Sequence, residues 1–300
     1  MFGHSVSYIL GFGNAHTNVV ATLTLRMFHV KQSKAKVAMG NLFTDIFEES
    51  AKTKGRFPLG GGNDNKKNLS YKTNIEQQNL LNQFLKGHDV QLSKEQMDKL
   101  YDFADLVVET KQFGNLISAK DSEKFLSRHI ADSLVPYIYI LDERRKTKDE
   151  RGALSSIVYQ RSDLSSIKWA DMGAGAGCPV FPLAIAMPGV QFYAVEPRHM
   201  RVEFMNYAKE KLGLKNLTVV GKRFETSGLT DLDFISCRAL STFENDWERA
   251  QPALKKGGLF VTLKSFNSIS HLENDPAVNI WKYNLPNEEQ DYALVTRGNK

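Results

Sequence analysis

The chain has 300 residues, 42% of them hydrophobic and 24% charged, which indicates a folded soluble protein with room for one large domain or two ordinary ones. The net charge of +5 and the pI of about 9.0 favour a polyanionic partner such as RNA but do not require one. The two cysteines, Cys178 and Cys237, exclude a disulfide framework and a zinc ligand set, and they favour a reducing compartment, the cytoplasm.

The first part of the chain carries few structural signals. Residues 5–25 are moderately apolar, but glycine, asparagine and histidine interrupt them and no Lys or Arg precedes them. We therefore expect neither a signal peptide nor a membrane span. Glycine clusters at 11–13 and 60–62 and a polar run at 63–68 predict disorder or loose structure over much of an extension that spans residues 1–74.

Three helices are expected next. Helical spacing of apolar residues begins near Ile75, and a clearer helix starts at Ser93, where Ser93 and Gln96 make a capping box ahead of an apolar stripe. A third helix starts near Asp121, and we expect Pro136 to disturb its end or to begin the next segment.

These helices define a helical region over residues 75–141, and a charged linker follows over residues 142–166. Its charge run at 142–151 is expected to be a solvated loop or helix face, with an RNA-facing role as the alternative.

The last part of the chain, residues 167–300, alternates between strand and helix patterns. The expected strands are Ile167–Asp171, Gln191–Glu196, Leu217–Val220, Asp233–Arg238, Leu259–Lys264, Trp281–Asn284 and Tyr292–Arg297. The expected helices lie at about 178–187, 198–212 and 243–254. This alternation predicts a Rossmann-like α/β domain with a seven-stranded, mostly parallel sheet and right-handed crossovers.

A glycine loop joins the first of these strands to its helix. Gly173, Gly175 and Gly177 alternate with other residues, and glycines let the backbone approach a ligand closely. The following helix start offers free N–H groups to an anionic group such as a carboxylate. Asp171 precedes the loop, and its carboxylate suits a cofactor with a cationic ammonium and sulfonium better than a diphosphate.

Glu196 ends the next expected strand. An acid at this place can accept hydrogen bonds from both hydroxyls of a ribose. The alternative is a solvated glutamate at a strand end. Together with the loop, Glu196 predicts a site for S-adenosylmethionine.

Several motifs in the same order complete a family pattern. They are Asn115-Leu116-Ile117, Arg128-His129-Ile130-Ala131-Asp132-Ser133, the extended glycine motif from Asp171 to Ala184, Glu196-Pro197-Arg198, Arg223-Phe224-Glu225, Cys237-Arg238-Ala239, and Lys256-Gly257-Gly258 followed by Leu263-Lys264. With these residues the chain resembles the bacterial 16S rRNA (guanine-N7)-methyltransferases, also known as glucose-inhibited division protein B. The resemblance runs from about Ser93 to Arg297 and implies a class I methyltransferase.

The chain departs from the family pattern in places. Val180 stands where the family usually has glycine, which puts the shape of the loop in question. Glu109-Thr110 replaces the usual Trp-Asn, and the segment after Lys264 is short. The string from Met27 to Gln32 resembles the start of many family members, so we interpret Met27 as the natural start.

The resemblance also implies roles for single residues. Besides Asp171 and the three loop glycines, the cofactor-binding residues would be Cys178, Glu196, Pro197, Arg198, Phe224, Glu225 and Arg238. The RNA-binding candidates are Arg128, His129, Arg198, Arg201, Arg223 and Lys264. For Arg198, Arg201 and Arg223 the alternative is a solvated arginine, for Arg238 an ion pair at the sheet edge, and for His129 a structural histidine on an apolar face.

The chemistry implied needs no catalytic acid or base, because guanine N7 carries a lone pair and no proton; positioning would supply the rate. The two cysteines are interpreted as packing residues and not as nucleophiles. We expect 16S rRNA or the small ribosomal subunit as partner, no membrane, no metal and a monomer. The alternatives are a methyltransferase for another RNA, a protein or a small molecule, an inactive RNA-binding relative, and a nicotinamide dehydrogenase.

Overall fold

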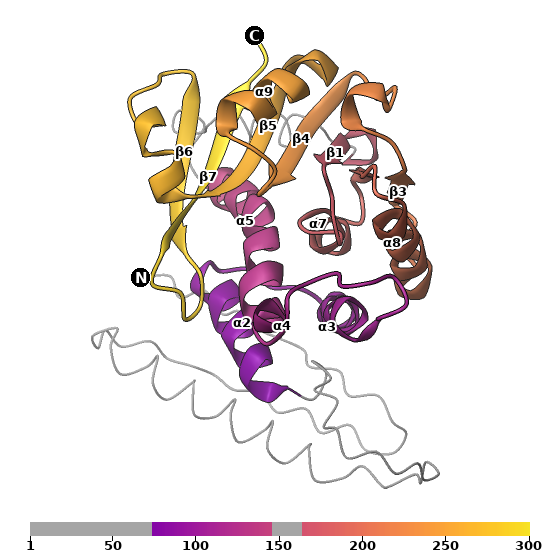
Figure 1. Cartoon of the computed structure of the whole chain (residues 1–300). Coiled ribbons are helices and arrows are strands. Elements are labelled where there is room, and N and C mark those ends of the chain that lie inside the picture. The colour runs from indigo at the N-terminus through magenta and orange to yellow at the C-terminus, as the bar shows by residue number, and fades with distance from the viewer. Residues whose placement is uncertain (1–73, 146–163) are drawn as a thin grey trace, which may run out of the picture. The chain divides into compact units, whose positions relative to one another are not determined.

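The computed structural model describes residues 74–145 and 164–300, and its described part is built on one seven-stranded sheet with the order β3-β2-β1-β4-β5-β7-β6 (Figure 1). The strands are β1 (Lys168–Met172), β2 (Gln191–Val195), β3 (Leu217–Val220), β4 (Leu232–Arg238), β5 (Leu254–Ser265), β6 (Val278–Asn284) and β7 (Asp291–Gly298). Strands β1 to β5 pair in parallel, and β7 pairs antiparallel with both β5 and β6. The prediction of a seven-stranded, mostly parallel sheet is confirmed.

Helices cover the sheet and precede it. They are α2 (Ile75–Gly87), α3 (Lys94–Glu109), α4 (Ala119–Ser122), the π-helix η1 (Phe125–Ile130), α5 (Ala131–Arg145), α7 (Val180–Ala186), α8 (His199–Leu212) and α9 (Phe243–Ala250). Short 3-10 turns are η2 (Leu164–Ser166), η3 (Phe224–Thr226), η4 (Gln251–Ala253), η5 (Phe266–Ser268) and η6 (Ser270–Leu272).

The two faces of the sheet have separate cores. Trp169 and Phe234 belong to one core, which also holds buried residues of α7, α8, α2, α3, η1 and α5. Ala170 and Ile235, one position further along their strands, belong to the other core, which holds the buried face of α9. Figure 1 shows α9 apart from α5, α7 and α3, in agreement with these two cores.

The helices before the sheet are therefore part of the same core as the sheet. Phe103 of α3 stacks on Phe181 of α7, with ring centroids 4.8 Å apart and planes within 7°. Such a contact joins α3 to the first helix after the glycine loop. The capping box expected at Ser93 and Gln96 is present, and Gln96 also donates through Nε2 to the carbonyls of Ile185 and Ala186 at the end of α7.

Two expectations about local structure were wrong. Pro136 lies inside α5, where it removes one backbone hydrogen bond, but Val135, Ile138 and Tyr139 on either side are buried and hold the helix together. The third helix is divided into α4, η1 and α5, with a π-helical turn in the middle. At Pro136, burial of the neighbouring residues outweighed the local propensity.

Some expectations fall outside the described residues. These are the extension before residue 74, the start at Met27 and the charged run beyond residue 145. The division of the chain at residues 74, 141 and 166 stays a prediction. In residues 74–145 and 164–300, no helix has the length and apolar character that a membrane crossing requires.

Candidate functional site

Three adjacent strands end beside the glycine loop. Asp171 of β1 is in register with Ala194 of β2 and with Ser236 of β4, so the carboxyl ends of all three strands meet there. The loop turns back onto β2, because the N–H groups of Gly173 and Ala174 both donate to the carbonyl of Val195 at 2.9 and 3.0 Å. This edge is where open parallel sheets bind their ligands.

Asp171 is buried at this edge with one oxygen in use. Its Oδ1 accepts from the Ser236 hydroxyl at 2.9 Å, whereas Oδ2 is buried and has no hydrogen-bond partner in the described residues. Burial raises the pKa of Asp171 to about 7, against the opposing effects of Ser236, Arg238 and the N–H of Val180. A buried carboxylate oxygen without a partner calls for a donor from a ligand, and a cationic ammonium fits.

The three loop glycines have left-handed backbone angles but different surroundings. Gly173, Gly175 and Gly177 have φ of 76°, 59° and 98°. A Cβ on Gly177 would lie 2.5 Å from the ring of Phe181, so that glycine serves packing. A Cβ on Gly175 would meet nothing closer than 3.9 Å. A Cβ on Gly175 would thus fit in ordinary contact with the Gly173 carbonyl and the Arg198 guanidinium, but a longer side chain there would fill the room that a ligand needs.

Glu196, directly after β2, is 1% exposed and holds the other side of the loop. Its Oε2 accepts from the N–H of Gly175 at 2.9 Å, and its Oε1 accepts from the N–H and Nε of Arg198 at 2.9 and 2.8 Å. Burial raises the pKa of Glu196, but the hydrogen bonds from Arg198 and Gly175 outweigh burial, and the pKa lies below its ordinary value. Glu196 is thus an ionised acceptor, as binding of a ribose diol requires.

The remaining cofactor candidates lie around this edge and differ in exposure and in their protein partners. Phe224 is 5% exposed and its ring belongs to the core. Glu225 is exposed and pairs with Arg249 of α9. Pro197 is exposed next to Glu196. Cys178 lies beside Arg238, and burial raises the pKa of its thiol, which disfavours a thiolate nucleophile.

Arg238 ends β4 and joins the glycine loop to the helices. Its NH1 donates to Oδ2 of Asp132 in α5 at 3.1 Å, and the Tyr283 hydroxyl of β6 donates to Oδ1 of the same carboxylate. The Arg238 side chain is 18% exposed. It therefore lies at the edge of the site and not on the open surface.

Arg128 and His129 are near this cluster but have protein partners. Arg128 donates to Asp121 at 3.0 Å. His129 packs against Phe125, with ring centroids 5.3 Å apart, and its Nε2 lies 3.4 Å from Asp121 without hydrogen-bond alignment. Burial lowers the pKa of His129 to about 4, and the nearby Arg238 adds to the effect. His129 is neutral near pH 7.

The other RNA candidates differ in exposure. Arg223 is exposed after β3, and the side chain of Arg198 is 66% exposed although it pairs with Glu196. Arg201 donates to the carbonyls of Leu116 and Asn115 at 2.6 and 3.0 Å, and so it fastens the loop of the Asn-Leu-Ile motif. Lys264 is 8% exposed and pairs with buried Asp246 at 2.8 Å.

Sequence reasoning missed several residues of the edge. Ser236, which holds Asp171, lies inside a strand pattern and carried no signal of its own. Ala239 has φ of 50°, a strained angle for a residue with a side chain, and Leu240 is 37% exposed while its side chain lies over Gly173. In the sequence, Ala239 stands out only as part of the Cys237-Arg238-Ala239 motif, and Leu240 follows that motif directly.

The chain is similar in sequence to known proteins. The family model of rRNA small subunit methyltransferase G matches residues 152–288. The ribosomal RNA small subunit methyltransferase G of Helicobacter pylori is 34% identical over 166 residues, which cover 55% of this chain and 80% of that protein. This chain belongs to the rRNA small subunit methyltransferase G family. The protein of the same name from Staphylococcus aureus strain Newman is 29% identical over 194 residues, 63% of this chain and 72% of that protein.

Solved structures give a weaker likeness. A SAM-dependent O-methyltransferase from Thermotoga maritima is 19% identical and has a TM-score of 0.37 over 53% of this chain and 71% of that chain. A TM-score this low does not assign the fold. The sheet order and the family itself establish the Rossmann-like fold.

The replacement of the family's usual glycine by Val180 does not distort the loop. Val180 is the first residue of α7, is fully buried, and has no left-handed backbone angle. Since a helical angle is open to any residue, valine is compatible with this loop.

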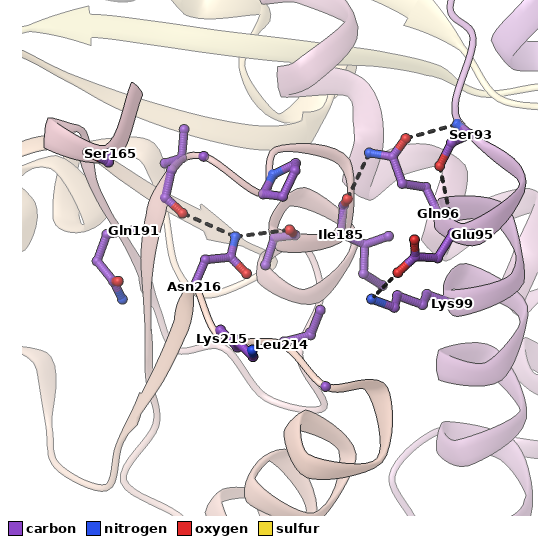
Figure 2. Close-up of a pocket in the computed structure, with 15 residues that line it drawn as sticks. Ser93, Glu95, Gln96, Lys99, Ser165, Ile185, Gln191, Leu214, Lys215 and Asn216 are labelled. Carbon is purple, nitrogen blue, oxygen red and sulfur yellow. Dashed lines mark hydrogen bonds and ion pairs between the residues drawn. The ribbon is translucent and has the colours of Figure 1, made fainter. Parts of the chain in front are cut away.

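A cavity lies at the opposite edge of the sheet. It has a volume of about 740 Å³ and its lining includes Gln96, Gln191 and Asn216 (Figure 2). Gln191 begins β2, whereas Glu196 follows the end of that strand, so this cavity is separate from the glycine loop. The amide of Asn216 donates to the carbonyls of Ala184, Met187 and Val190, which gives Asn216 a structural role.

Proposed function

We propose that this protein methylates N7 of a specific guanine in 16S rRNA and takes the methyl group from S-adenosylmethionine. The observation that carries the proposal is the buried Asp171 with its unpartnered oxygen at the glycine loop, in a chain of the rRNA small subunit methyltransferase G family. The proposal covers the substrate atom, which family membership alone leaves open.

The residues at the carboxyl edge fit the cofactor. We assign Asp171 to the ammonium, Glu196 to the ribose hydroxyls, and the open space at Gly175 to the body of the ligand. Arg198 now donates to Glu196, so binding of a ribose would require the Arg198 side chain to move aside. When bound, S-adenosylmethionine would supply a methyl group activated by a sulfonium.

The side chains near the site match a reaction without a base. His129 is neutral above a pKa of about 4, but its ring packs on Phe125 and its Nε2 is buried, so that nitrogen is not available to a substrate. Burial holds the thiols of Cys178 and Cys237 protonated. Positioning of N7 against the methyl group is then the main contribution of the protein.

The exposed cations near this edge support RNA as the substrate. Arg198 and Arg223 are accessible to phosphates, whereas Lys264 and Arg201 are held by protein groups. We further propose that the protein works as a monomer in the cytoplasm, on 16S rRNA either free or in the small ribosomal subunit.

The test is nucleotide mapping of N7-methylguanine in 16S rRNA from a strain that lacks the protein. One guanine should lose its methyl group, and the wild-type gene should restore it. The variant Glu196→Ala should not restore it, whereas Gln96→Ala, at the opposite edge, should. An unchanged methylation map would overturn the proposal, and calorimetry would then separate a methyltransferase for another substrate, which binds S-adenosylhomocysteine, from a dehydrogenase, which binds NAD.

A further inference from the structure

Most N–H donors of the Arg238 guanidinium have no acceptor among the described residues, so they can bind a further group. Among the described residues its guanidinium makes one hydrogen bond, to Asp132, out of the five N–H groups that arginine carries. Its side chain is 18% exposed, so Arg238 is not completely enclosed by the protein. An arginine in such a place can bind an acceptor without leaving its present partner.

A buried carboxylate and a tyrosine fix the direction of Arg238. Asp132 is 8% exposed and Tyr283 is 5% exposed. The ring of Tyr283 stacks with those of Trp281 and Tyr292, with centroids 5.9 Å away in each pair, and its hydroxyl donates to Asp132. Burial of an ion pair is weak evidence for a role in stability, because desolvation offsets the attraction. The arrangement is better explained by a role in orienting the Arg238 guanidinium.

The orientation of Arg238 matters because β4 ends beside β1 and the glycine loop. In the sheet, β2 with Glu196 lies on one side of β1, and β4 with Arg238 lies on the other. Arg238 neighbours Cys178 of the glycine loop, and the next residues are strained Ala239 and exposed Leu240, which covers Gly173. A base that approaches the loop opposite the ribose acid therefore meets Arg238 and an apolar surface.

We propose that Arg238 donates a hydrogen bond to O6 of the target guanine and thereby selects guanine, with Asp132 and Tyr283 as positioning residues. This inference rests on the proposed function. O6 is the acceptor beside N7 on the same edge of guanine, whereas adenine carries an amino donor at that place, which an arginine would repel.

The charge of the Arg238–Asp132 pair suits the reaction. Methylation leaves a positive charge on the guanine ring, and an isolated arginine beside it would repel that charge. Asp132 balances Arg238, so the pair presents a strong donor with no net charge. The donor then favours guanine without opposing the transfer.

The experiment compares two bases at the mapped position of 16S rRNA. Guanine and 2-aminopurine both have N7, but 2-aminopurine lacks O6. Single-turnover methylation is measured on both RNAs, and the result is the ratio of the two rates. Because both rates come from one enzyme preparation, a loss of folded protein cancels from the ratio.

The variants separate the proposal from a general loss of activity. The ratio in Arg238→Met measures the intrinsic difference in reactivity of the two bases. We expect the wild-type ratio to exceed it by about tenfold to a hundredfold, the worth of a hydrogen bond to a charged donor. Tyr283→Phe should give an intermediate ratio. Its matched control is Tyr139→Phe, which removes a buried hydroxyl bonded to Asn279 and should keep the wild-type ratio.

Calorimetry with S-adenosylhomocysteine completes the test. Its affinity should be the same in the wild type and in Arg238→Met. Equal base ratios in the wild type, Arg238→Met and Tyr283→Phe would overturn the inference, and a parallel loss of S-adenosylhomocysteine affinity would assign Arg238 to the cofactor carboxylate. Absence of any N7 methylation by the wild type would instead overturn the proposed function.

Discussion

The two edges of the sheet contrast in how their polar groups are satisfied. At the amino edge, the cavity of about 740 Å³ is lined by amides that already donate to carbonyls, three from Asn216 and two from Gln96 (Figure 2). At the carboxyl edge, Asp171 keeps a buried oxygen without a partner and Ala239 has a strained backbone angle. The amides of Asn216 and Gln96 in this cavity thus have their acceptors without a ligand.

The contrast shows which features mark a site in this fold. A cavity forms wherever helices and loops leave space, but an unsatisfied buried oxygen and a strained residue each destabilise the protein by about 1 to 3 kcal/mol. The unpartnered Oδ2 of Asp171 is such a feature at the edge where open parallel sheets bind their ligands. If this interpretation is right, changes at the carboxyl edge alter binding, and changes at the amino edge alter stability.

The largest effect on binding is expected from Gly175→Leu. A leucine would fill the open space before the loop, and S-adenosylhomocysteine binding by calorimetry should be lost while the protein stays folded. The matched control is Gly213→Leu at the amino edge, which also has a left-handed glycine (φ 63°) with open space around it. Both variants should lose about 1 to 2 kcal/mol of stability, but only the control should keep its affinity.

The opposite edge should respond in stability alone. Asn216→Ala removes an amide that donates to three carbonyls, of which that of Met187 keeps the N–H of Val190, and should lower the free energy of unfolding by about 1 to 3 kcal/mol. Urea denaturation measures this loss. Affinity for S-adenosylhomocysteine should not change, and a change would break the contrast between the edges.

A dependence on pH should come from Asp171. Because its pKa is about 7 and a cationic ammonium needs the carboxylate, affinity for S-adenosylhomocysteine should rise by about tenfold per pH unit below pH 7 and level off above it. The folded protein holds this proton more tightly than the unfolded chain, with an ordinary pKa of 3.8, so the ligand-free protein should lose stability as pH rises from about 4 to 7.

The variant Asp171→Asn tests the origin of both trends. It should bind S-adenosylhomocysteine weakly at every pH and lose the change in stability. Persistence of either trend in this variant would assign it to another group.

A smaller effect concerns RNA. If Arg223 contacts a phosphate, Arg223→Gln should reduce the slope of log affinity against log salt by about 0.7 to 0.9 for 16S rRNA. Arg201→Gln should leave the slope unchanged and lower the melting temperature, because Arg201 holds the carbonyls of Asn115 and Leu116. Filter binding at several salt concentrations gives both slopes. Equal slopes for Arg223→Gln and the wild type would show that Arg223 is a solvated arginine that contacts no phosphate.

The smallest expected effect is on the rate of transfer. With saturating cofactor and RNA, the single-turnover rate should be nearly flat between about pH 6 and 9, because His129 has a pKa of about 4 and N7 needs no base. His129→Ala should lower stability and leave the rate per folded molecule close to wild type. A sigmoidal rise that a single substitution removes would point to a different target atom.

The sequence by itself determined the order of the elements and the centre of the site. Periodicity predicted all seven strands, and the capping box at Ser93 predicted the start of α3. Gly175 and Glu196 were found because a left-handed turn and an acid at a strand end are properties of neighbours in the chain. Such local requirements are visible without a structure.

The tertiary structure decided which long side chains are available. Lys264 and Arg201 are alike in sequence to other basic RNA candidates, but folding brings Asp246 to the first and two backbone carbonyls to the second. The cluster of Asp132, Arg238 and Tyr283 unites three distant parts of the chain. A charged group takes the partner that packing places beside it, and packing depends on the whole fold and not on the residues next in sequence.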